Sequence, residues 1–344
     1  MSVPLLSTKL NIPRPRANVV VRSRLTEKLL ASVKLSGSFV LLSGPAGFGK
    51  TTLLSEFAAE LHKPAAWVSL DEADNDPIQF WTYVITACQS IHHEMGGSAL
   101  AILQAPQPFP DETIPTILIN DIAKMQDDLV LVLDDYHVIQ NSSIHAGLAF
   151  ILDHLPSNLH LVFSTRADPP WPLARFRARD QLVEIRAADL RFTLEETTAF
   201  LNQVMGLNLS SENVAALETR TEGWIASLQL AALSMKGRAD VTGFIKAFTG
   251  SHAYVAEYLI EEVLEHQPQD VKTFLLQTSI LERLNAGLCE AVSGRRDSQA
   301  ILKDLYQSNL FVLPLDDEGQ WFRYHHLFAD LLRARLQQSL SAES

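Results

Sequence analysis

The chain has 344 residues, a formal net charge of −12 and 47% hydrophobic residues, which is ordinary for a soluble globular protein of two or three domains. The acidic balance argues against a surface that binds nucleic acid, because such surfaces carry clustered lysine and arginine. The only cysteines are Cys88 and Cys289. They exclude a disulfide scaffold and a cysteine-rich zinc site, and they suit a reducing cytoplasm.

Neither the N-terminus nor the most apolar segment indicates export or membrane insertion. Pro4 interrupts the first apolar stretch, and Pro13 and Pro15 follow it, so it lacks the core of a signal peptide. The segment from Ile225 to Met235 is far too short to cross a bilayer. The sequence therefore predicts a cytoplasmic protein with no membrane partner.

Apolar runs in the first half of the chain alternate with helical segments. Residues 1–18 are expected to form an extended lead-in, followed by a short helix through Leu30. Helical segments separate the earlier apolar runs, a pattern that predicts an α/β fold with a parallel sheet and helices on both faces. The predicted strands are 38–43, 65–70, 129–133, 160–164 and 182–185. The proline-rich residues 104–115 are expected to form a surface loop.

The segment 44–51, Gly-Pro-Ala-Gly-Phe-Gly-Lys-Thr, fits the phosphate-loop pattern G-x-x-x-x-G-K-[ST]. It lies between a predicted strand and a predicted helix, which is the context that the motif requires. Its glycines allow backbone N–H groups to surround a phosphate, and the helix N-terminus favours an anion. Lys50 is expected to reach the β- and γ-phosphates, and the Thr51 hydroxyl is expected to bind Mg²⁺.

Two later strand ends supply candidate catalytic residues. The strand 129–133 ends in Asp134 and Asp135. The first is expected to hold Mg²⁺, and the second to orient or deprotonate the attacking water. Arg166 follows the next strand, and carboxyl ends of parallel strands gather at the ligand crevice, so Arg166 is placed to sense a γ-phosphate. A solvated Asp-Asp turn and a surface arginine are the alternatives.

Strand signals stop near residue 190. Thr193 and Glu196 have the spacing of a capping box, which predicts a helix through Met205. Further helices are predicted to begin at Ser210 or Ser211 and at Ile225. We read this stretch as a small helical domain.

Residues 311–324 contain two apolar runs around an Asp-Asp-Glu-Gly turn, a pattern typical of a hairpin wing. An amphipathic helix is predicted from His326 to Leu336. The expected domains are a nucleotide-binding domain at 1–189, a helical domain at 190–265 and a winged-helix domain at 266–344.

Several stretches along the chain match one protein family in order. They are 8–10, 20–25, 44–52, 70–77, 133–137, 164–170, 190–193, 222–224 and 323–328. Together they cover nearly the whole chain. With them, the chain resembles the P-loop ATPase module of the STAND class, specifically the MalT-like branch of large LuxR-type transcriptional regulators.

The resemblance implies a nucleotide-binding, a helical and a winged-helix domain that hold ATP or ADP between them, with Mg²⁺. In such proteins ADP maintains a closed monomer. An inducer and ATP favour an open state that self-associates, and slow hydrolysis resets the switch. The implied nucleotide contacts are Val20, Val21 and Arg22 on the adenine–ribose side, and Gly44, Pro45, Ala46, Gly47, Phe48, Gly49, Lys50, Thr51, Thr52 and His325 at the phosphates. Asp134 and Thr51 would serve Mg²⁺, with Asp135, Lys50 and Arg166 as the catalytic residues.

Two features depart from the family pattern. Other branches of the class carry a proline two residues after a glycine of the helical domain, whereas this chain has Gly223-Trp224-Ile225. MalT-like regulators also continue into a sensor domain and a DNA-binding helix-turn-helix. The expectation is therefore that segments outside this chain recognise the inducer and DNA, and that the chain is either a fragment or a stand-alone module.

Two other functions fit the same motifs. One is a metabolic or motor P-loop ATPase, which would need a substrate pocket and fast turnover. The other is a nucleotide-stabilised scaffold that does not hydrolyse ATP. Asp135 argues against the scaffold, and no second catalytic cluster supports the metabolic enzyme.

Overall fold

The computed structural model describes residues 4–14, 19–61, 63–105, 110–238 and 240–342. The chain divides into two compact units. The first comprises Met1–Ala17, Val21–Gly44 and Lys50–Asp189, and the second comprises Asn18–Val20, Pro45–Gly49 and Leu190–Ser344. Most of the phosphate loop thus groups with the second unit. The predicted division of residues 190–344 at 265 stays a prediction.

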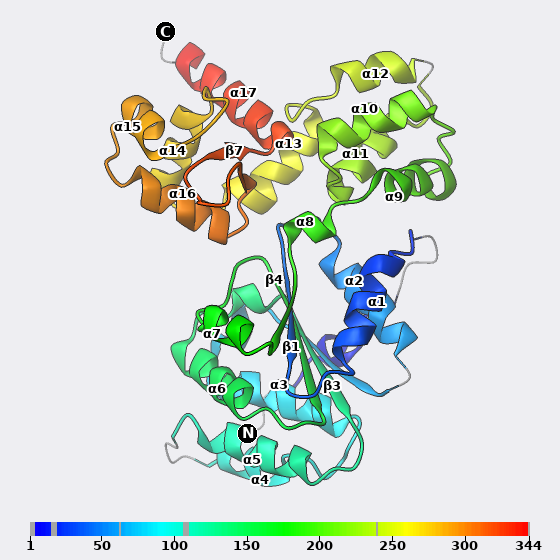
Figure 1. The fold of residues 1–344 in the computed structure, drawn as a ribbon, viewed down its shortest axis with the longest axis vertical. Coiled ribbons are helices and arrows are strands. Elements are labelled where there is room, and N and C mark those ends of the chain that lie inside the picture. Colours follow the sequence, from blue (N-terminus) through cyan, green and yellow to red (C-terminus); the bar gives the residue numbers. More distant parts are fainter. Residues whose placement is uncertain (1–3, 15–18, 62, 106–109, 239, 343–344) are drawn as a thin grey trace. The chain divides into compact units, whose positions relative to one another are not determined.

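The first unit is built on a five-stranded sheet in the order β2-β3-β4-β1-β5 (Figure 1). Every pairing is parallel. The strands are β1 Phe39–Ser43, β2 Ala65–Ser69, β3 Leu129–Asp134, β4 Leu159–Thr165 and β5 Leu182–Ile185. Each begins and ends within one residue of its predicted position. The α/β fold class is therefore confirmed, and the sheet order places β1 between β4 and β5.

Helices cover both faces of this sheet (Figure 1). Phe39 and Leu41 of β1 join the large core formed with α3, α5, α6 and α7. Successive strand residues point to opposite faces, so Val40 and Leu42 face the side covered by α1 and α2. The helices are α1 Ser23–Ser32, α2 Lys50–Glu60, α3 Pro77–Gln89, α4 Gly97–Leu103, α5 Thr113–Ala123, α6 Ser142–Asp153, α7 Leu173–Ala178 and α8 Ala187–Leu190.

Two local predictions for the first unit are wrong. The expected loop 104–115 overlaps α5, because Pro115 is the third residue of that helix and proline is tolerated in a first turn. The lead-in is not extended throughout, since Ser7–Leu10 forms a 3-10 turn. Lys9 in this turn forms ion pairs with Asp71 and Asp74. Residues 1–3, 15–18 and 106–109 lie outside the described residues.

The described residues of the second unit form helices and a hairpin (Figure 1). The Thr193–Glu196 capping box is confirmed. The helix it opens continues as a π-helix over Ala199–Val204. A second π-helix, Ile260–Leu264, continues α13. The helices are α9 Leu194–Thr198, α10 Ser211–Thr221, α11 Ile225–Met235, α12 Val241–Ala247, α13 Ala253–Leu259, α14 Gln269–Thr278, α15 Ala286–Ser293, α16 Ser298–Gln307 and α17 His326–Ala342.

The predicted wing is confirmed as an antiparallel hairpin of β6 Val312–Pro314 and β7 Phe322–Tyr324. Helix α17 follows it directly and runs six residues beyond the predicted end at Leu336. Phe322, Phe328 and Leu332 are fully buried. The hairpin and the helix behind it therefore share one core.

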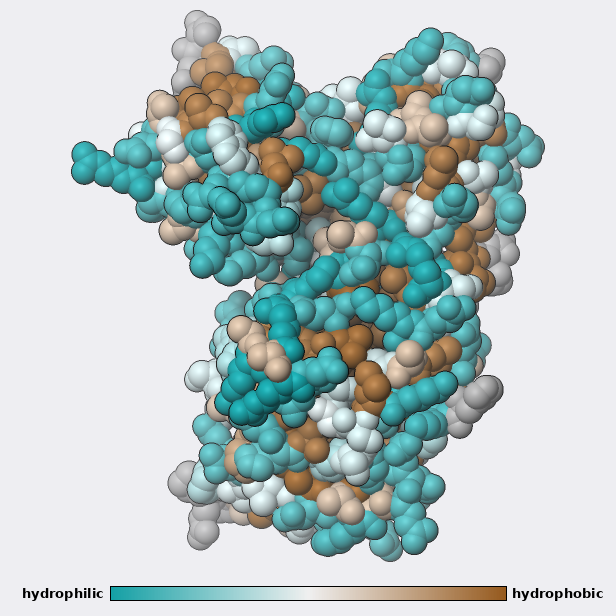
Figure 2. All heavy atoms as spheres, in the orientation of Figure 1, coloured by the Kyte–Doolittle hydropathy of each residue, from teal (hydrophilic) through white to brown (hydrophobic). Residues whose placement is uncertain are grey.

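Most of the visible face belongs to hydrophilic residues, with smaller apolar patches between them (Figure 2). Among the described residues, no helix is long and apolar enough to cross a membrane. The two cysteines are buried, Cys88 in α3 and Cys289 in α15. Burial raises the pKa of Cys88 to about 12 and that of Cys289 to about 11.

Candidate functional site

Lys50 of the phosphate loop is the first residue of α2, and its side chain is buried in the first unit. Its Nζ donates a hydrogen bond to the Gly44 carbonyl at 2.8 Å. Burial lowers the pKa of Lys50 to about 8, although Asp135 and Asp134 act in the opposite direction. A desolvated ammonium of this kind is strongly stabilised by an arriving anion. The position suits a phosphate ligand.

Thr51, the residue after Lys50, is hydrogen-bonded to Asp134. The Thr51 hydroxyl donates to Asp134 Oδ2 at 2.8 Å. Asp134 ends β3 and is 2% exposed, and its Oδ1 is buried without a hydrogen-bond partner among the described residues. Mg²⁺ usually binds one or two protein oxygens of this kind, and phosphate and water oxygens complete its coordination. The residues therefore fit Mg²⁺. Within the described ranges no cluster of three or more His, Cys, Asp or Glu could hold a metal without a nucleotide.

Asp135 differs from its neighbour in conformation and exposure. Its φ is 59°, in the left-handed region, and its side chain is 45% exposed. His137 Nδ1 lies 3.8 Å from Asp135 Oδ1. Burial, together with the charges of Arg166 and Lys50, lowers the pKa of His137 to about 3. His137 is therefore neutral at pH 7, and Asp135 is the more accessible of the two carboxylates.

Arg166 follows the last residue of β4. Its charge lowers the pKa of both Lys50 and His137, which places the guanidinium near them. The first unit therefore brings together Lys50, Thr51, Asp134, Asp135 and Arg166 at the carboxyl ends of its strands. This is the arrangement that the sequence predicts. Thr52 is exposed in the first turn of α2.

The predicted adenine-side segment divides between the two units. Val20 groups with the second unit and is half-buried. Val21 is 63% exposed and Arg22 is 4% exposed. Arg22 Nη2 lies 3.5 Å from the Asp189 carbonyl oxygen, and Arg24 Nη1 donates to the same oxygen at 2.7 Å. Both arginines thus contact the last residue of the first unit, a role that sequence reasoning missed.

Residues 45–49 of the loop contact α11 and the residue before it, all in the second unit. Trp224 Nε1 donates to the Ala46 carbonyl at 3.0 Å, and the Ala226 amide donates to the Gly47 carbonyl at 3.1 Å. Gly47 has φ +74°, and a Cβ there would lie 2.6 Å from the Ala226 Cβ. The Phe48 ring lies 6.3 Å from that of Phe311. Trp224, which directly precedes the position where other branches carry proline, is therefore a contact of the phosphate loop.

His325 lies in the same unit, 1% exposed, with its ring 5.9 Å from that of Trp224. Its Nε2 is 3.0 Å from the Thr221 carbonyl, so this nitrogen carries the proton. Burial lowers the pKa of His325 to about 4. The buried Nδ1 has no hydrogen-bond partner among the described residues. The neutral ring thus offers an acceptor there, and a hydrogen bond from Nδ1 to a phosphate requires a second proton or a ring rotation.

Glu222 is a further residue that sequence reasoning did not single out by itself. It follows α10 with φ 49° and is 8% exposed. Arg323 donates to both carboxylate oxygens, at 2.8 and 2.7 Å, and Arg191 Nη2 lies 3.2 Å from Oε2. Burial opposes the charged form, but Arg323, the nearby His325 and the His326 amide hold the pKa of Glu222 at about 2. The Glu222-Gly223-Trp224 motif was the available signal.

Two family descriptions match the chain. Residues 18–164 match the AAA ATPase domain, and residues 260–344 match the MalT winged helix domain. Among solved structures, the Walker-type ATPase PABY2304 of Pyrococcus abyssi superimposes with a TM-score of 0.65 at 14% identity, covering 93% of this chain and 98% of that one. The structural likeness supports the fold.

Curated relatives match across almost the whole chain. The HTH-type transcriptional regulator MalT of Yersinia enterocolitica is 35% identical over 98% of this chain and 37% of its own length. The serine/threonine-protein kinase PknK of Mycobacterium tuberculosis is 33% identical over 97% of this chain and 30% of its own length. The chain thus spans about a third of these relatives. With both domain matches in sequence order, the chain is an ATPase module of the MalT-like type, an AAA ATPase domain followed by a MalT winged helix domain.

Proposed function

We propose that this module is a slow ATP/ADP switch that controls self-association in a MalT-like regulator. The observation that carries the proposal is the group formed by Lys50, the Thr51–Asp134 pair, Asp135 and Arg166 at one edge of the sheet. Its residue types fit binding and hydrolysis of a nucleoside triphosphate. Relatives named as a transcriptional regulator and as a kinase share the module, which favours a regulatory role over a metabolic one.

Each residue has a defined role in this proposal. Lys50 and the loop amides bind the β- and γ-phosphates, and Arg166 contacts the γ-phosphate. Thr51 and Asp134 hold Mg²⁺, which neutralises phosphate charge when bound. Asp135, the accessible carboxylate, orients the attacking water and accepts its proton. Val20, Val21 and Arg22 lie on the adenine–ribose side. His325 contacts the phosphates in the ADP state, after its ring rotates or takes up a second proton.

The contacts of residues 45–49 support a switch rather than a simple hydrolase. Because this part of the loop is bonded to Trp224 and Ala226, a nucleotide that reshapes the loop acts directly on the second unit. Moving an equilibrium from 1:99 to 99:1 needs about 5.5 kcal/mol of differential binding. Several charge-assisted contacts made with only one nucleotide can supply this. The inducer and DNA would then be recognised by segments outside this chain.

The test is the nucleotide content and turnover of the purified protein. Stoichiometric ADP, released on denaturation, with turnover far below about 1 s⁻¹ supports the switch. An empty site with fast turnover favours a metabolic or motor ATPase, and an empty, inactive site favours a scaffold. Asp135→Asn should retain ATP while hydrolysis slows at least about 100-fold. The matched control is Asp127→Asn, an exposed carboxylate just before the same strand; equal turnover in both variants would remove Asp135 from the catalytic role.

A further inference from the structure

The segment that carries Arg166 is anchored to β1 on both sides of the arginine. Before it, the Thr165 carbonyl accepts a hydrogen bond at 3.2 Å from the amide of Gly44, the first residue of the phosphate loop. After it, Asp168 Oδ1 accepts one at 3.3 Å from the hydroxyl of Ser43, the last residue of β1. Ser43 and Thr165 are fully buried. Arg166 thus lies between two residues, Thr165 and Asp168, that are hydrogen-bonded to Gly44 and Ser43.

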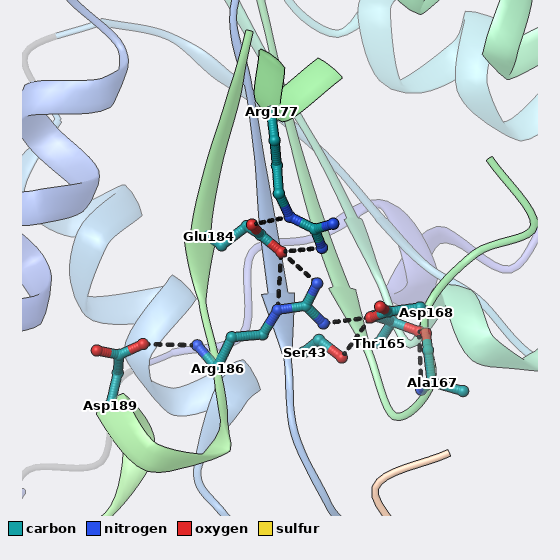
Figure 3. Close-up of polar contacts among 8 residues, drawn as sticks. All are labelled: Ser43, Thr165, Ala167, Asp168, Arg177, Glu184, Arg186 and Asp189. Atoms are coloured by element: carbon teal, nitrogen blue, oxygen red, sulfur yellow. Dashed lines mark hydrogen bonds and ion pairs between the residues drawn. The ribbon is translucent and has the colours of Figure 1, made fainter. Parts of the chain in front are cut away.

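The turn around Arg166 is closed by a side chain. Thr165 Oγ1 donates to the Ala167 carbonyl at 2.6 Å and accepts from the Ala167 amide at 3.3 Å (Figure 3). These bonds fix the backbone on each side of Arg166.

Asp168 is also bound by an arginine next to β5, the strand that pairs with β1 on the side opposite β4. Arg186, just after β5, binds the same Asp168 Oδ1 through Nη1 (Figure 3). Its Nε donates to Glu184 Oε1 at 2.9 Å. Arg177 donates to both oxygens of Glu184, from Nε to Oε2 at 2.6 Å and from Nη2 to Oε1 at 2.9 Å. Burial opposes the charge of Arg186, but Asp168 and Glu184 outweigh it and raise its pKa. The four charges balance and hold one another in place.

Arg186 also reaches the end of the first unit. Its amide donates to Asp189 Oδ2 at 2.8 Å (Figure 3), and the Asp189 carbonyl is the acceptor for Arg24. Arg186 therefore contacts both Asp168 and Asp189. This series of polar contacts connects the residue after the Arg166 turn with the last residue of the unit.

We infer that Asp168, clamped by Arg186, is a positioning residue that aims Arg166 at a γ-phosphate and thereby sets the preference for ATP over ADP. The inference rests on the proposed role of Arg166. ADP lacks the γ-phosphate, so misdirecting Arg166 weakens ATP binding and leaves ADP binding unchanged. A residue needed only for folding would affect both nucleotides together.

The experiment compares the affinities of a non-hydrolysable ATP analogue and of ADP for nucleotide-free protein. Asp168→Asn keeps the shape of the side chain and removes the charge that Arg186 binds. The analogue should bind about tenfold more weakly, as expected for one misaligned charge-assisted contact, with ADP affinity within about twofold of the parent. Asp153→Asn is the control, because it breaks an ion pair with Arg175 elsewhere in the same unit.

A double-variant cycle separates this inference from the role of Arg166 itself. In an Arg166→Ala background, Asp168→Asn should cause no further loss of analogue affinity. The same tenfold loss in that background, or an equal loss for ADP, overturns the inference. If Arg166→Ala alone leaves analogue affinity unchanged, the proposed role of Arg166 fails instead. Should Asp168→Asn not fold, Arg186→Gln breaks the same contact from the other side and gives the same readings.

Discussion

Glu222→Gln tests how strongly charge holds the second unit together. The substitution preserves the shape of the side chain and removes its charge. Arg323, which donates to both carboxylate oxygens, would then face one acceptor oxygen and one amide donor. Arg191 at 3.2 Å and the His326 amide at 3.1 Å lose the same anion. Breaking one partner of a buried pair leaves the other charge uncompensated.

The magnitude follows from the depressed pKa. The pKa of Glu222 is about 2 against an ordinary 4.5, which corresponds to about 3 kcal/mol of unfolding free energy at neutral pH. A depressed carboxyl pKa contributes stability that is fully present above the unfolded value, here 4.5. That stability is lost as the pH falls from 4.5 towards 2. The difference in unfolding free energy between the parent and the variant should therefore be largest at pH 7. Near pH 3 it should be smaller by more than half.

Urea unfolding followed by circular dichroism measures this difference. With a slope of about 2 kcal/mol per molar urea, the transition of the second unit should shift down by about 1.5 M at pH 7. Glu290→Gln, at an exposed carboxylate of α15, provides the matched control and should not shift it. If the two variants have the same midpoint, the Glu222 network does not stabilise the unit and the reasoning is wrong.

Two more results are expected. Because the pKa of Lys50 is about 8 in the nucleotide-free protein and only its protonated form pairs with phosphate, ADP affinity should be level up to about pH 7.5. The affinity should then fall by up to tenfold per pH unit above about pH 8. Calorimetric titration of the parent with ADP at several pH values measures this. If Lys50→Ala shows the same pH dependence of ADP affinity, another group causes it. Gly250→Ala places a Cβ 1.6 Å from the Leu327 carbonyl oxygen and should lower the unfolding free energy of the second unit by about 1–3 kcal/mol. Gly287→Ala, whose nearest neighbour is 3.7 Å away, should be close to neutral, and equal unfolding midpoints for the two would contradict the packing.

The sheet and the group around the phosphate loop could be predicted because their signals are local. An apolar run bounded by polar residues defines each strand, and a strand–loop–helix context makes the motif at 44–51 specific. Asp134 and Arg166 could be placed because parallel strands end at a common edge. The Thr193 capping box could be read for the same reason, since both its hydrogen bonds join residues three apart.

The networks that hold the site could not be predicted, because they depend on strand order. Ser43, Asp168 and Arg186 meet only because β1 lies between β4 and β5, and nothing in the spacing of these residues fixes that order. Glu222 and Arg323 are about a hundred residues apart and meet through packing of the second unit. The loop prediction over 104–115 failed because proline composition does not distinguish a loop from the first turn of a helix.

The placement of the two cysteines gives each unit its own chemical reporter. Cys88 and Cys289 are the chain's only thiols, and each lies buried in a different unit. An alkylating reagent needs an exposed thiolate, so each label is acquired only when the surrounding unit opens. Peptide mass spectrometry of the unaltered protein can thus time the opening of the two units separately. The same sample then reports which unit ADP protects.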